Sequence, residues 1–136
     1  MNKVIIVDID GTVAEKTDRH IFDYKKVLTD SPKPEVIEVV NSLWKNGHKV
    51  IFLSGRPDSC FDDTYEWLRL NCPPFVKLLM RKTGDNRKDA EIKKEIYFND
   101  IHPNFDVLCV LDDRQQVVDM WREIGLTCLQ VAPGDF

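Results

Sequence analysis

Two aspartates separated by one residue, Asp8 and Asp10, directly follow an apolar run of valine and isoleucine near the start of the chain. Such a run is typical of a strand buried on both faces, as in a parallel sheet. Carboxylates beside an apolar core require a metal, another cation or a shifted pKa. Gly11 lets the backbone turn sharply, so both side chains can face one small volume. The pair therefore predicts a ligand site at the strand's carboxyl end, with an ordinary surface turn as the alternative.

Two later strand-like runs also end in polar groups. Ser54, Gly55 and Arg56 follow the second run, and Asp112 and Asp113 follow the fourth. A parallel sheet places these ends at one edge, and both acid pairs converge if the fourth strand lies beside the first. The carboxylates would then repel one another, and a hard divalent cation with oxygen ligands, such as Mg²⁺, would relieve the repulsion. Such a centre predicts an anionic ligand, and a phosphate fits it.

Groups that could bind phosphoryl oxygens lie near the same strand ends. The Ser54 hydroxyl and the backbone N–H groups of Gly55 and Arg56 can donate hydrogen bonds, and the Arg56 guanidinium adds a forked, charged contact. Lys88 begins a predicted helix, where the helix dipole already favours anions. Its equally charged neighbours are Arg81, Lys82, Arg87, Lys93 and Lys94. Spacing alone therefore leaves a solvated helix residue as an equal alternative for Lys88.

The elements that would hold these groups alternate along the chain. Apolar runs predict five strands, over 3–9, 49–53, 75–80, 105–111 and 126–131. Helical spacing of apolar residues predicts four helices, over 34–46, 58–71, 88–98 and 115–124. Residues 11–28 are polar and irregular. The alternation favours right-handed βαβ units, and so an α/β fold whose parallel sheet carries helices on both faces.

Composition bounds the class of protein. The chain has 136 residues, of which 43% are hydrophobic and 31% charged, and this suits one globular domain spanning 1–136. A net charge of −4 does not mark a nucleic-acid binder, although a local basic cluster can still serve one. Four cysteines without CxxC or zinc spacing indicate a reducing, cytoplasmic compartment. No apolar run approaches the ~18 residues of a membrane span, so we expect no membrane association.

Four motifs, taken in order, resemble those of the haloacid-dehalogenase-like (HAD) phosphohydrolases. They are Asp8-Ile9-Asp10-Gly11-Thr12, Ser54, Lys88 and Asp112-Asp113. Longer stretches resemble the 3′-phosphatase domain of bacteriophage polynucleotide kinase-phosphatases. These stretches are residues 10–14, 53–56, 84–89, 112–122 and 130–136. The resemblance covers essentially the whole chain and implies a HAD-like Rossmannoid three-layer sandwich. Because the segments between the motifs are short, we expect a minimal cap or none.

The resemblance also implies a Mg²⁺-dependent phosphomonoesterase that works through an aspartyl phosphate. Asp8 would attack phosphorus, and Asp10 would protonate the leaving hydroxyl and then activate water. The implied metal ligands are Asp8, the backbone of Asp10, Asp112 and the adjacent Asp113. The implied substrate-binding and phosphate-binding residues are Thr12, Arg19, Ser54, Gly55, Arg56, Asp85 and Lys88. Lys88 would also be catalytic, because a lysine there can neutralise the nucleophile and the bound phosphate together.

Three functional hypotheses remain open at this point. The first is removal of 3′-phosphates from DNA or RNA ends, because an uncapped site admits a polymer end and the loop over 81–88 is basic. The second is a nucleotidase or other small-molecule phosphatase, since fold and motif do not fix the substrate. The third is a signalling module that stores a phosphate on an aspartate, as response-regulator receivers do.

The expected partners and compartment follow from the same features. The chain has no GxxxxGK[ST] loop, so phosphorylation of 5′ ends would require a separate kinase, and sealing would require a ligase. We expect the reaction to take place in the cytoplasm, which would be that of a host if a phage encodes the chain. Whether DNA, RNA or a free nucleotide is preferred stays open.

Overall fold

The computed structural model describes residues 3–15 and 23–136. A five-stranded parallel sheet runs through it in the order β5-β4-β1-β6-β7. The strands are β1 (Val4–Val7), β4 (Lys49–Pro57), β5 (Lys77–Arg81), β6 (Val107–Asp112) and β7 (Cys128–Gln130). β6 lies directly beside β1, so the two acid-bearing strand ends are neighbours.

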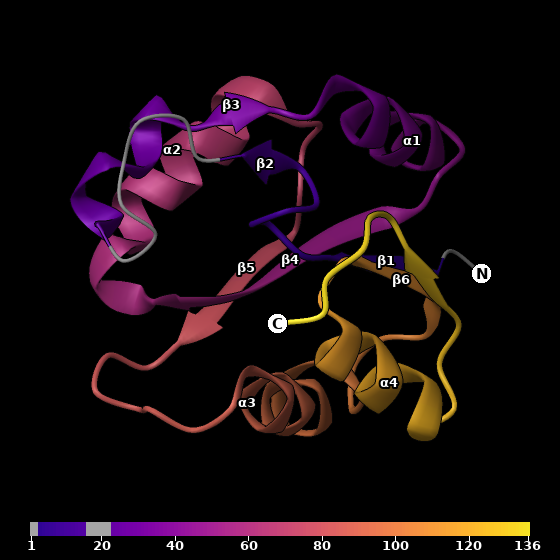
Figure 1. Ribbon diagram of the computed structural model, residues 1–136. Coiled ribbons are helices and arrows are strands. Elements are labelled where there is room, and N and C mark those ends of the chain that lie inside the picture. The colour runs from indigo at the N-terminus through magenta and orange to yellow at the C-terminus, as the bar shows by residue number, and fades with distance from the viewer. Residues whose placement is uncertain (1–2, 16–22) are drawn as a thin grey trace.

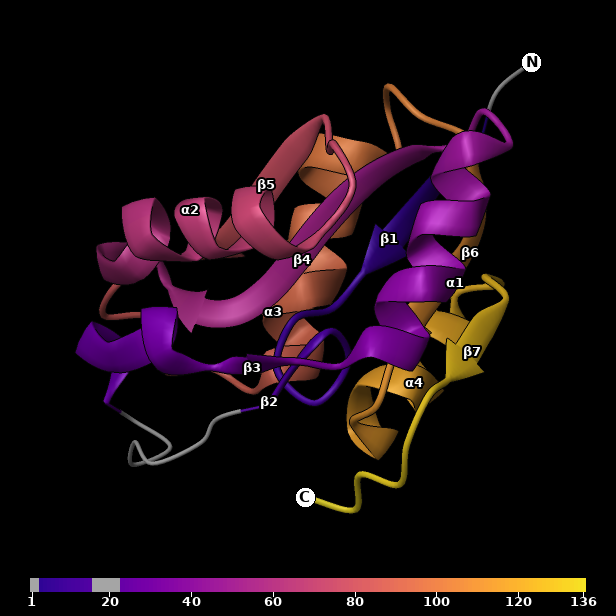
Figure 2. The same cartoon turned by 90° about the horizontal axis from the view of Figure 1, so that it is seen from above.

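Helices cover both faces of this sheet (Figures 1 and 2). α1 (Pro34–Lys45) and α2 (Phe61–Asn71) lie on one face, and α3 (Asp89–Ile96) and α4 (Gln115–Glu123) lie on the other. A π-helical turn over Tyr97–Ile101 extends α3. None of these helices combines the length and apolarity needed to cross a membrane. The three-layer α/β sandwich confirms the predicted fold class.

The hydrophobic core is divided into two halves by the central sheet. Ile5 packs with residues of α1 and α2, whereas Ile6 packs with the π-helical turn and α4, because successive strand residues point to opposite faces. Trp67 is buried in the first half and Trp121 in the second. β1 is therefore packed on both faces, and this packing positions the residues at the end of the strand.

The chain between β1 and α1 forms a small flap and no cap domain in the part that the structure describes. β2 (Ala14–Glu15) and β3 (Ser31–Pro32) pair antiparallel, and the 3₁₀ helix η1 (Tyr24–Thr29) precedes β3. These elements are too short to produce a periodic pattern, which is why the segment reads as irregular in the sequence. Arg19, predicted to contact substrate, lies outside the described residues.

β4 runs further than its apolar residues indicate. The predicted strand ends at Leu53, but the extended backbone continues through Ser54, Gly55 and Arg56 to Pro57. Pairing with β5 shifts register between Ser54 and Pro57 and resumes where Pro57 opposes Arg81. A short 3₁₀ helix, η2 (Asp58–Cys60), then leads into α2. The polar residues after Leu53 are thus held by the sheet itself and not by a free loop.

Candidate active site

Three buried aspartates, Asp8, Asp112 and Asp113, meet where β1 and β6 end, and we call them the carboxylate cluster. Each offers a carboxylate oxygen, and these oxygens lie within 4.8 Å of one another. The Thr12 hydroxyl donates a 2.9 Å hydrogen bond to Asp8 Oδ2, and the backbone N–H of Asp113 donates one of 2.9 Å to Asp112 Oδ1. Gly11 has a φ of +80°, and a Cβ there would lie 2.1 Å from Asp113 Oδ2. Glycine is therefore required for the turn that packs against the cluster.

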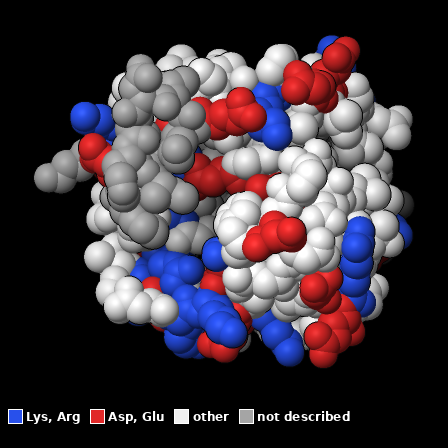
Figure 3. Space-filling view, viewed as in Figure 1, with Lys and Arg blue, Asp and Glu red and all other residues white. Residues whose placement is uncertain are grey.

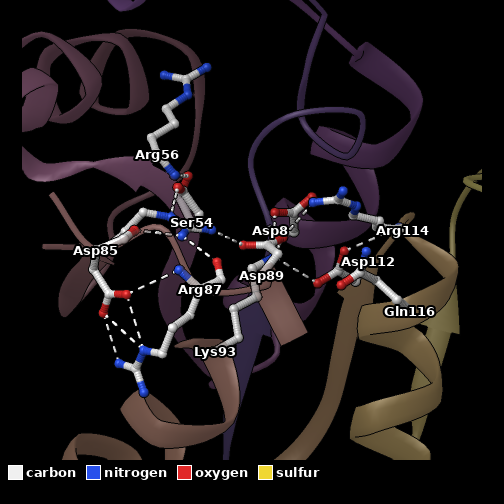
Figure 4. A network of polar contacts seen from close by, with 12 residues as sticks. Asp8, Ser54, Arg56, Asp85, Arg87, Asp89, Lys93, Asp112, Arg114 and Gln116 are labelled. Atoms are coloured by element: carbon white, nitrogen blue, oxygen red, sulfur yellow. Dashed lines mark hydrogen bonds and ion pairs between the residues drawn. The ribbon is translucent and has the colours of Figure 1, made fainter. Parts of the chain in front are cut away.

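A buried lysine of α3, Lys93, contacts this cluster. Its Nζ lies 2.8 Å from Asp8 Oδ1 and 3.0 Å from Asp112 Oδ2, and the side chain is 1% exposed. Figure 4 shows the side chain rising from α3 toward these carboxylates. Burial lowers the pKa of Lys93, but the charges of Asp112, Asp8 and Asp89 outweigh burial and hold it well above the usual value. Lys93 is therefore a permanently charged partner of the aspartates.

Lys88, predicted from sequence to fill this role, lies elsewhere. It immediately precedes α3, where its exposed side chain borders the cavity mouth. Lys93 follows Asp89 by four residues, so the two share the face of α3 that turns toward the sheet. Ile92, also buried, lies beside them. The signal in the sequence was this Asp89–Lys93 spacing next to a buried isoleucine, and not the start of the helix.

The carboxylate cluster carries more negative charge than Lys93 balances. Burial, followed by the charge of Asp112, raises the pKa of Asp8 well above its ordinary value, and burial likewise raises the pKa of Asp113. Three buried oxygen ligands in need of a further cation fit a hard divalent ion, which would stabilise their ionised forms. The site therefore fits a metal such as Mg²⁺, held by the carboxylates of Asp8, Asp112 and Asp113.

The Asp10 side chain is bound by Arg56 and is not a member of the carboxylate cluster. Arg56 Nε donates a 2.9 Å hydrogen bond to Asp10 Oδ2, and its Nη2 lies 2.7 Å from Asp10 Oδ1, which makes a two-point contact. The buried guanidinium also contacts Asp30 Oδ2 at 2.8 Å and Thr64 Oγ1 at 3.1 Å. Burial lowers the pKa of Arg56, but the hydrogen bond and charge of Asp10 outweigh it and raise the pKa.

This arrangement changes the role predicted for Arg56. In Figure 4 its guanidinium points away from Asp8, whereas the sequence suggested a contact to a phosphoryl group beside Asp8. The sequence could not reveal this, because the partner that fixes the guanidinium from behind, Asp30, lies far away along the chain in the flap. Arg56 is placed to orient Asp10.

Asp89 links α3 to the strand end that carries Ser54 and Gly55. A Cβ on Gly55 would lie 2.0 Å from Asp89 Oδ1, so only glycine leaves room for this carboxylate. Asp89 also lies 3.7 Å from Lys93 Nζ and 3.7 Å from Arg114 Nη1. The buried hydroxyl of Ser54 accepts a 3.0 Å hydrogen bond from the backbone N–H of Arg56. Asp89, which was not among the predicted site residues, is thus central to the site.

Asp85, the predicted functional carboxylate of this region, lies on the exposed loop between β5 and α3. We call residues 82–88 the basic loop. Arg87 Nη2 lies 2.8 Å from Asp85 Oδ2, and the hydrogen bonds of Arg87 lower the pKa of Asp85 to about 2. Arg81 fixes the loop from inside, because its Nη1 donates to the carbonyl oxygens of Asp85 at 2.8 Å and Arg87 at 2.7 Å. The loop is therefore preformed.

The basic loop and the carboxylate cluster border one cavity of about 840 Å³. The buried Asp8, Asp112 and Asp113 line its inner part, which we call the floor, and the exposed Arg87, Lys88 and Phe136 line its outer part, which we call the rim. In Figure 3 acidic atoms lie inside the central hollow, and Lys and Arg atoms gather beside it. An anion that enters this cavity therefore passes cations at the rim before it reaches the floor.

Comparisons with known proteins agree with this geometry. The family described as polynucleotide kinase PNKP phosphatase domain matches residues 2–136. A candidate bifunctional polynucleotide kinase/RNA ligase from Autographa californica nuclear polyhedrosis virus is 34% identical over 128 residues, which are 91% of this chain and 18% of the viral protein.

Two solved structures extend the comparison. A chain in the structure of the Pnkp1/Rnl/Hen1 RNA repair complex is 40% identical, with a TM-score of 0.94 over 99% of this chain and 44% of that chain. A class C acid phosphatase from Bacillus anthracis with tungstate bound is 16% identical, with a TM-score of 0.70 over 98% of this chain and 67% of that chain. The acid phosphatase shares the fold. The chain spans less than half the length of the viral protein and of the repair-complex chain.

Proposed function

This chain belongs to the family of polynucleotide kinase PNKP phosphatase domains, and from that membership we propose that it hydrolyses 3′-phosphates at DNA or RNA ends. The observation that supports this most is the position of Asp8, buried at the end of β1 and 2.8 Å from Lys93 Nζ. A carboxylate held beside a fixed cation can approach a phosphate, because the cation offsets their mutual repulsion. We propose that residues 1–136 act as one phosphatase domain.

Asp8 and Asp10 divide the proposed chemistry between them. An Asp8 oxygen attacks phosphorus, the bond from phosphorus to the 3′ oxygen breaks, and Asp10 gives its proton to that leaving oxygen. Asp10, now ionised, takes a proton from water as the water oxygen attacks the aspartyl phosphate, which releases phosphate and regenerates Asp8. Arg56 keeps Asp10 oriented through both steps. Mg²⁺ bound by the carboxylate cluster would neutralise charge on the nucleophile and the phosphoryl oxygens.

The remaining site residues fall into two groups in this proposal. Lys93, in place of Lys88, neutralises the nucleophile and the phosphoryl group, and the Ser54 hydroxyl and the Gly55 backbone N–H donate to phosphoryl oxygens. Thr12 orients Asp8 through its 2.9 Å hydrogen bond. Lys88 and the rest of the basic loop attract the substrate from the rim. The floor binds one phosphate, and the cations of the rim can attract further phosphates of the same substrate. This arrangement favours a polynucleotide over a small phosphomonoester.

The test compares phosphate release from 3′-phosphorylated DNA and RNA oligonucleotides with release from free 3′-mononucleotides, with Mg²⁺ and with a chelator. We expect higher kcat/KM on oligonucleotides, no turnover with chelator, and none from Asp8→Asn. Good turnover of mononucleotides with none of oligonucleotides would overturn the polymer claim. Full activity of Asp8→Asn would overturn the mechanism.

A nucleotidase is the second candidate, and the cavity is the observation that favours it. A volume of about 840 Å³ is enough to enclose a mononucleotide. The two candidates use the same floor and differ in what the rim contributes. The basic loop therefore decides between them, because its removal should slow an oligonucleotide phosphatase and leave a nucleotidase unchanged.

We also propose that kinase and ligase activities reach the same ends from other domains or other chains. The viral relative and the repair-complex chain are both longer than this chain, and the name of the first joins a kinase to an RNA ligase. Four free cysteines, Cys60, Cys72, Cys109 and Cys128, suit a reducing compartment, which supports the cytoplasm as the place of action. Co-purification of a ligase or kinase with the chain from its native source would test the partnership.

A further inference from the structure

An exposed aromatic ring lies at the cavity mouth on the side away from the flap. Phe136 lines the same cavity as Asp8 and is 63% exposed. Its ring centroid is 5.1 Å from the guanidinium carbon of Arg114, which also lines the cavity. An apolar ring of this size that stays exposed beside a catalytic cavity can gain free energy by covering another flat surface.

The position of Phe136 is fixed by contacts to the loop that carries the carboxylate cluster. Arg114 Nε donates a 2.8 Å hydrogen bond to the backbone oxygen of Phe136, and the backbone N–H of Gln115 donates one of 2.7 Å to the carbonyl oxygen of Gly134. A Cβ on Gly134 would lie 2.3 Å from the backbone oxygen of Asp113, so glycine lets the segment lie against that loop. In Figure 2 the C-terminal segment that follows β7 runs past α4 and projects beyond the sheet. The ring therefore has a defined place relative to the metal-binding floor.

The two sides of the cavity mouth differ in chemistry. On one side the basic loop presents Arg87 and Lys88, which line the cavity, and the exposed Lys82 belongs to the same loop. On the other side Phe136 and Arg114 present a flat aromatic and guanidinium surface. Cations bind phosphodiesters, whereas aromatic and guanidinium planes stack on nucleobases without regard to sequence. The 3′ end of a nucleic acid offers both kinds of group, because a phosphodiester and a nucleobase are attached on opposite sides of its terminal sugar.

We propose that Phe136, supported by Arg114, is a stacking platform for the nucleobase of the 3′-terminal nucleotide. This proposal rests on the proposed function, because it takes the 3′-phosphate to lie on the carboxylate cluster. The platform would bind any of the four bases. It would help the enzyme to bind a nucleotide end in preference to a simple phosphomonoester. Phe136 would then be a substrate-binding residue that takes no part in phosphoryl transfer.

The first test removes the ring and the base separately. Phe136→Ala should raise KM about tenfold on a 3′-phosphorylated oligonucleotide with a normal terminal base and leave kcat nearly unchanged. On the same oligonucleotide with an abasic terminal nucleotide, the variant and the wild type should match, and Phe136→Trp should retain tight binding. Phe98→Ala, which removes a phenylalanine that is 43% exposed outside the residues lining the cavity, is the matched control.

The second test does not depend on turnover. In an Asp8→Asn background, a 3′-phosphorylated oligonucleotide with 2-aminopurine as its terminal base should lose fluorescence on binding, and Phe136→Ala should abolish the loss. Equal KM changes on normal and abasic ends, or unchanged quenching without the ring, would overturn the platform. Absence of phosphate release by the wild type, with quenching that needs Phe136, would instead overturn the proposed function and keep the platform.

Discussion

The floor and the rim of the cavity use the same residue types in opposite ways. On the floor, Lys93 is 1% exposed and contacts two carboxylates within 3.0 Å. On the rim, Arg87 is 45% exposed and is paired with Asp85 and Glu95 at the surface. Buried charges are costly to leave unpaired and have shifted pKa values, whereas exposed pairs contribute little to stability. The floor can therefore do chemistry, and the rim can mainly attract and guide.

The largest expected effect distinguishes the buried Lys93 of the floor from the exposed Lys88 of the rim. Lys93→Met leaves Asp8 and Asp112 without their cation, so we expect kcat/KM on a 3′-phosphorylated oligonucleotide to fall by about 10²–10³-fold. Lys88→Met removes only an exposed rim charge, and its loss should be within about tenfold. Steady-state kinetics, with circular dichroism to verify folding, measure both.

The reverse ranking would break the comparison. If Lys88→Met lost far more activity than Lys93→Met, the lysine predicted from sequence would be the catalytic one. Lys93→Arg is the conservative control, because it keeps the charge but not the compact ammonium that fits between two carboxylates. We expect it to recover only part of the activity.

The unbalanced charge of the floor predicts a second, smaller effect, on stability. Because burial raises the pKa of Asp8 and Asp113 in the folded protein, the folded state binds more protons than the unfolded state above the ordinary carboxyl value of 3.8. The metal-free protein should therefore lose stability as pH rises from that value through the raised pKa values. Mg²⁺ should raise Tm by a few degrees and flatten the decline.

Thermal melts from pH 5 to 8, with Mg²⁺ and with chelator, measure this effect. Asp112→Asn is the matched variant, because it removes one of the repelling charges. It should melt higher than the wild type in chelator and respond less to Mg²⁺. A wild-type Tm that rises with pH in chelator would show that repulsion among the ionised carboxylates of the cluster does not destabilise the folded protein.

The fold and the floor's acids follow from local patterns in the sequence. The apolar run before Asp8 specifies a doubly buried strand, and the βαβ alternation requires parallel strands whose ends share an edge. β6 lies beside β1 because the strand order changes direction once, after β5. The two acid pairs suggested this change, since it brings them together. These inferences use periodicity and chain order, and both are properties of short stretches.

The cations were harder to place, because the local signal for Lys93, its spacing from Asp89 beside Ile92, does not by itself say which side chain reaches the acids. Which of the two lysines on α3 enters the core depends on how the helix is rotated against the sheet, and in the observed rotation the Asp89 carboxylate lies against Gly55. Arg56 is fixed by Asp30, whose position depends on the path of the flap. Such contacts join residues distant along the chain, and long flexible side chains have no periodic signature of their partners.

The third effect concerns the rim and should be several-fold. Replacing Lys82 and Lys88 together by alanine removes two exposed charges from the basic loop, so oligonucleotide binding should weaken at low salt. The slope of log K against log salt should fall by about 0.7 for each phosphate of a single strand that is no longer neutralised. Phosphate release from a free 3′-mononucleotide is the control and should stay unchanged. An equal reduction on both substrates would place these lysines at the reacting phosphate.

The smallest effect separates the charge of the rim from its shape. Asp85 pairs with Arg87 and has its pKa lowered to about 2, so it is ionised throughout the working range and the pair is lost only as pH falls toward that value. Asp85→Asn should leave the loop in place, because Arg81 still donates to the carbonyl oxygens of residues 85 and 87. It also adds one net positive charge, so oligonucleotide KM at low salt should fall by up to about twofold, with kcat unchanged.

A large loss of kcat would make Asp85 the functional carboxylate that the sequence suggested, and the rim could no longer be described as acting only by attraction. A small gain would instead show that the rim acts by its charge and that the demanding chemistry belongs to the buried floor alone.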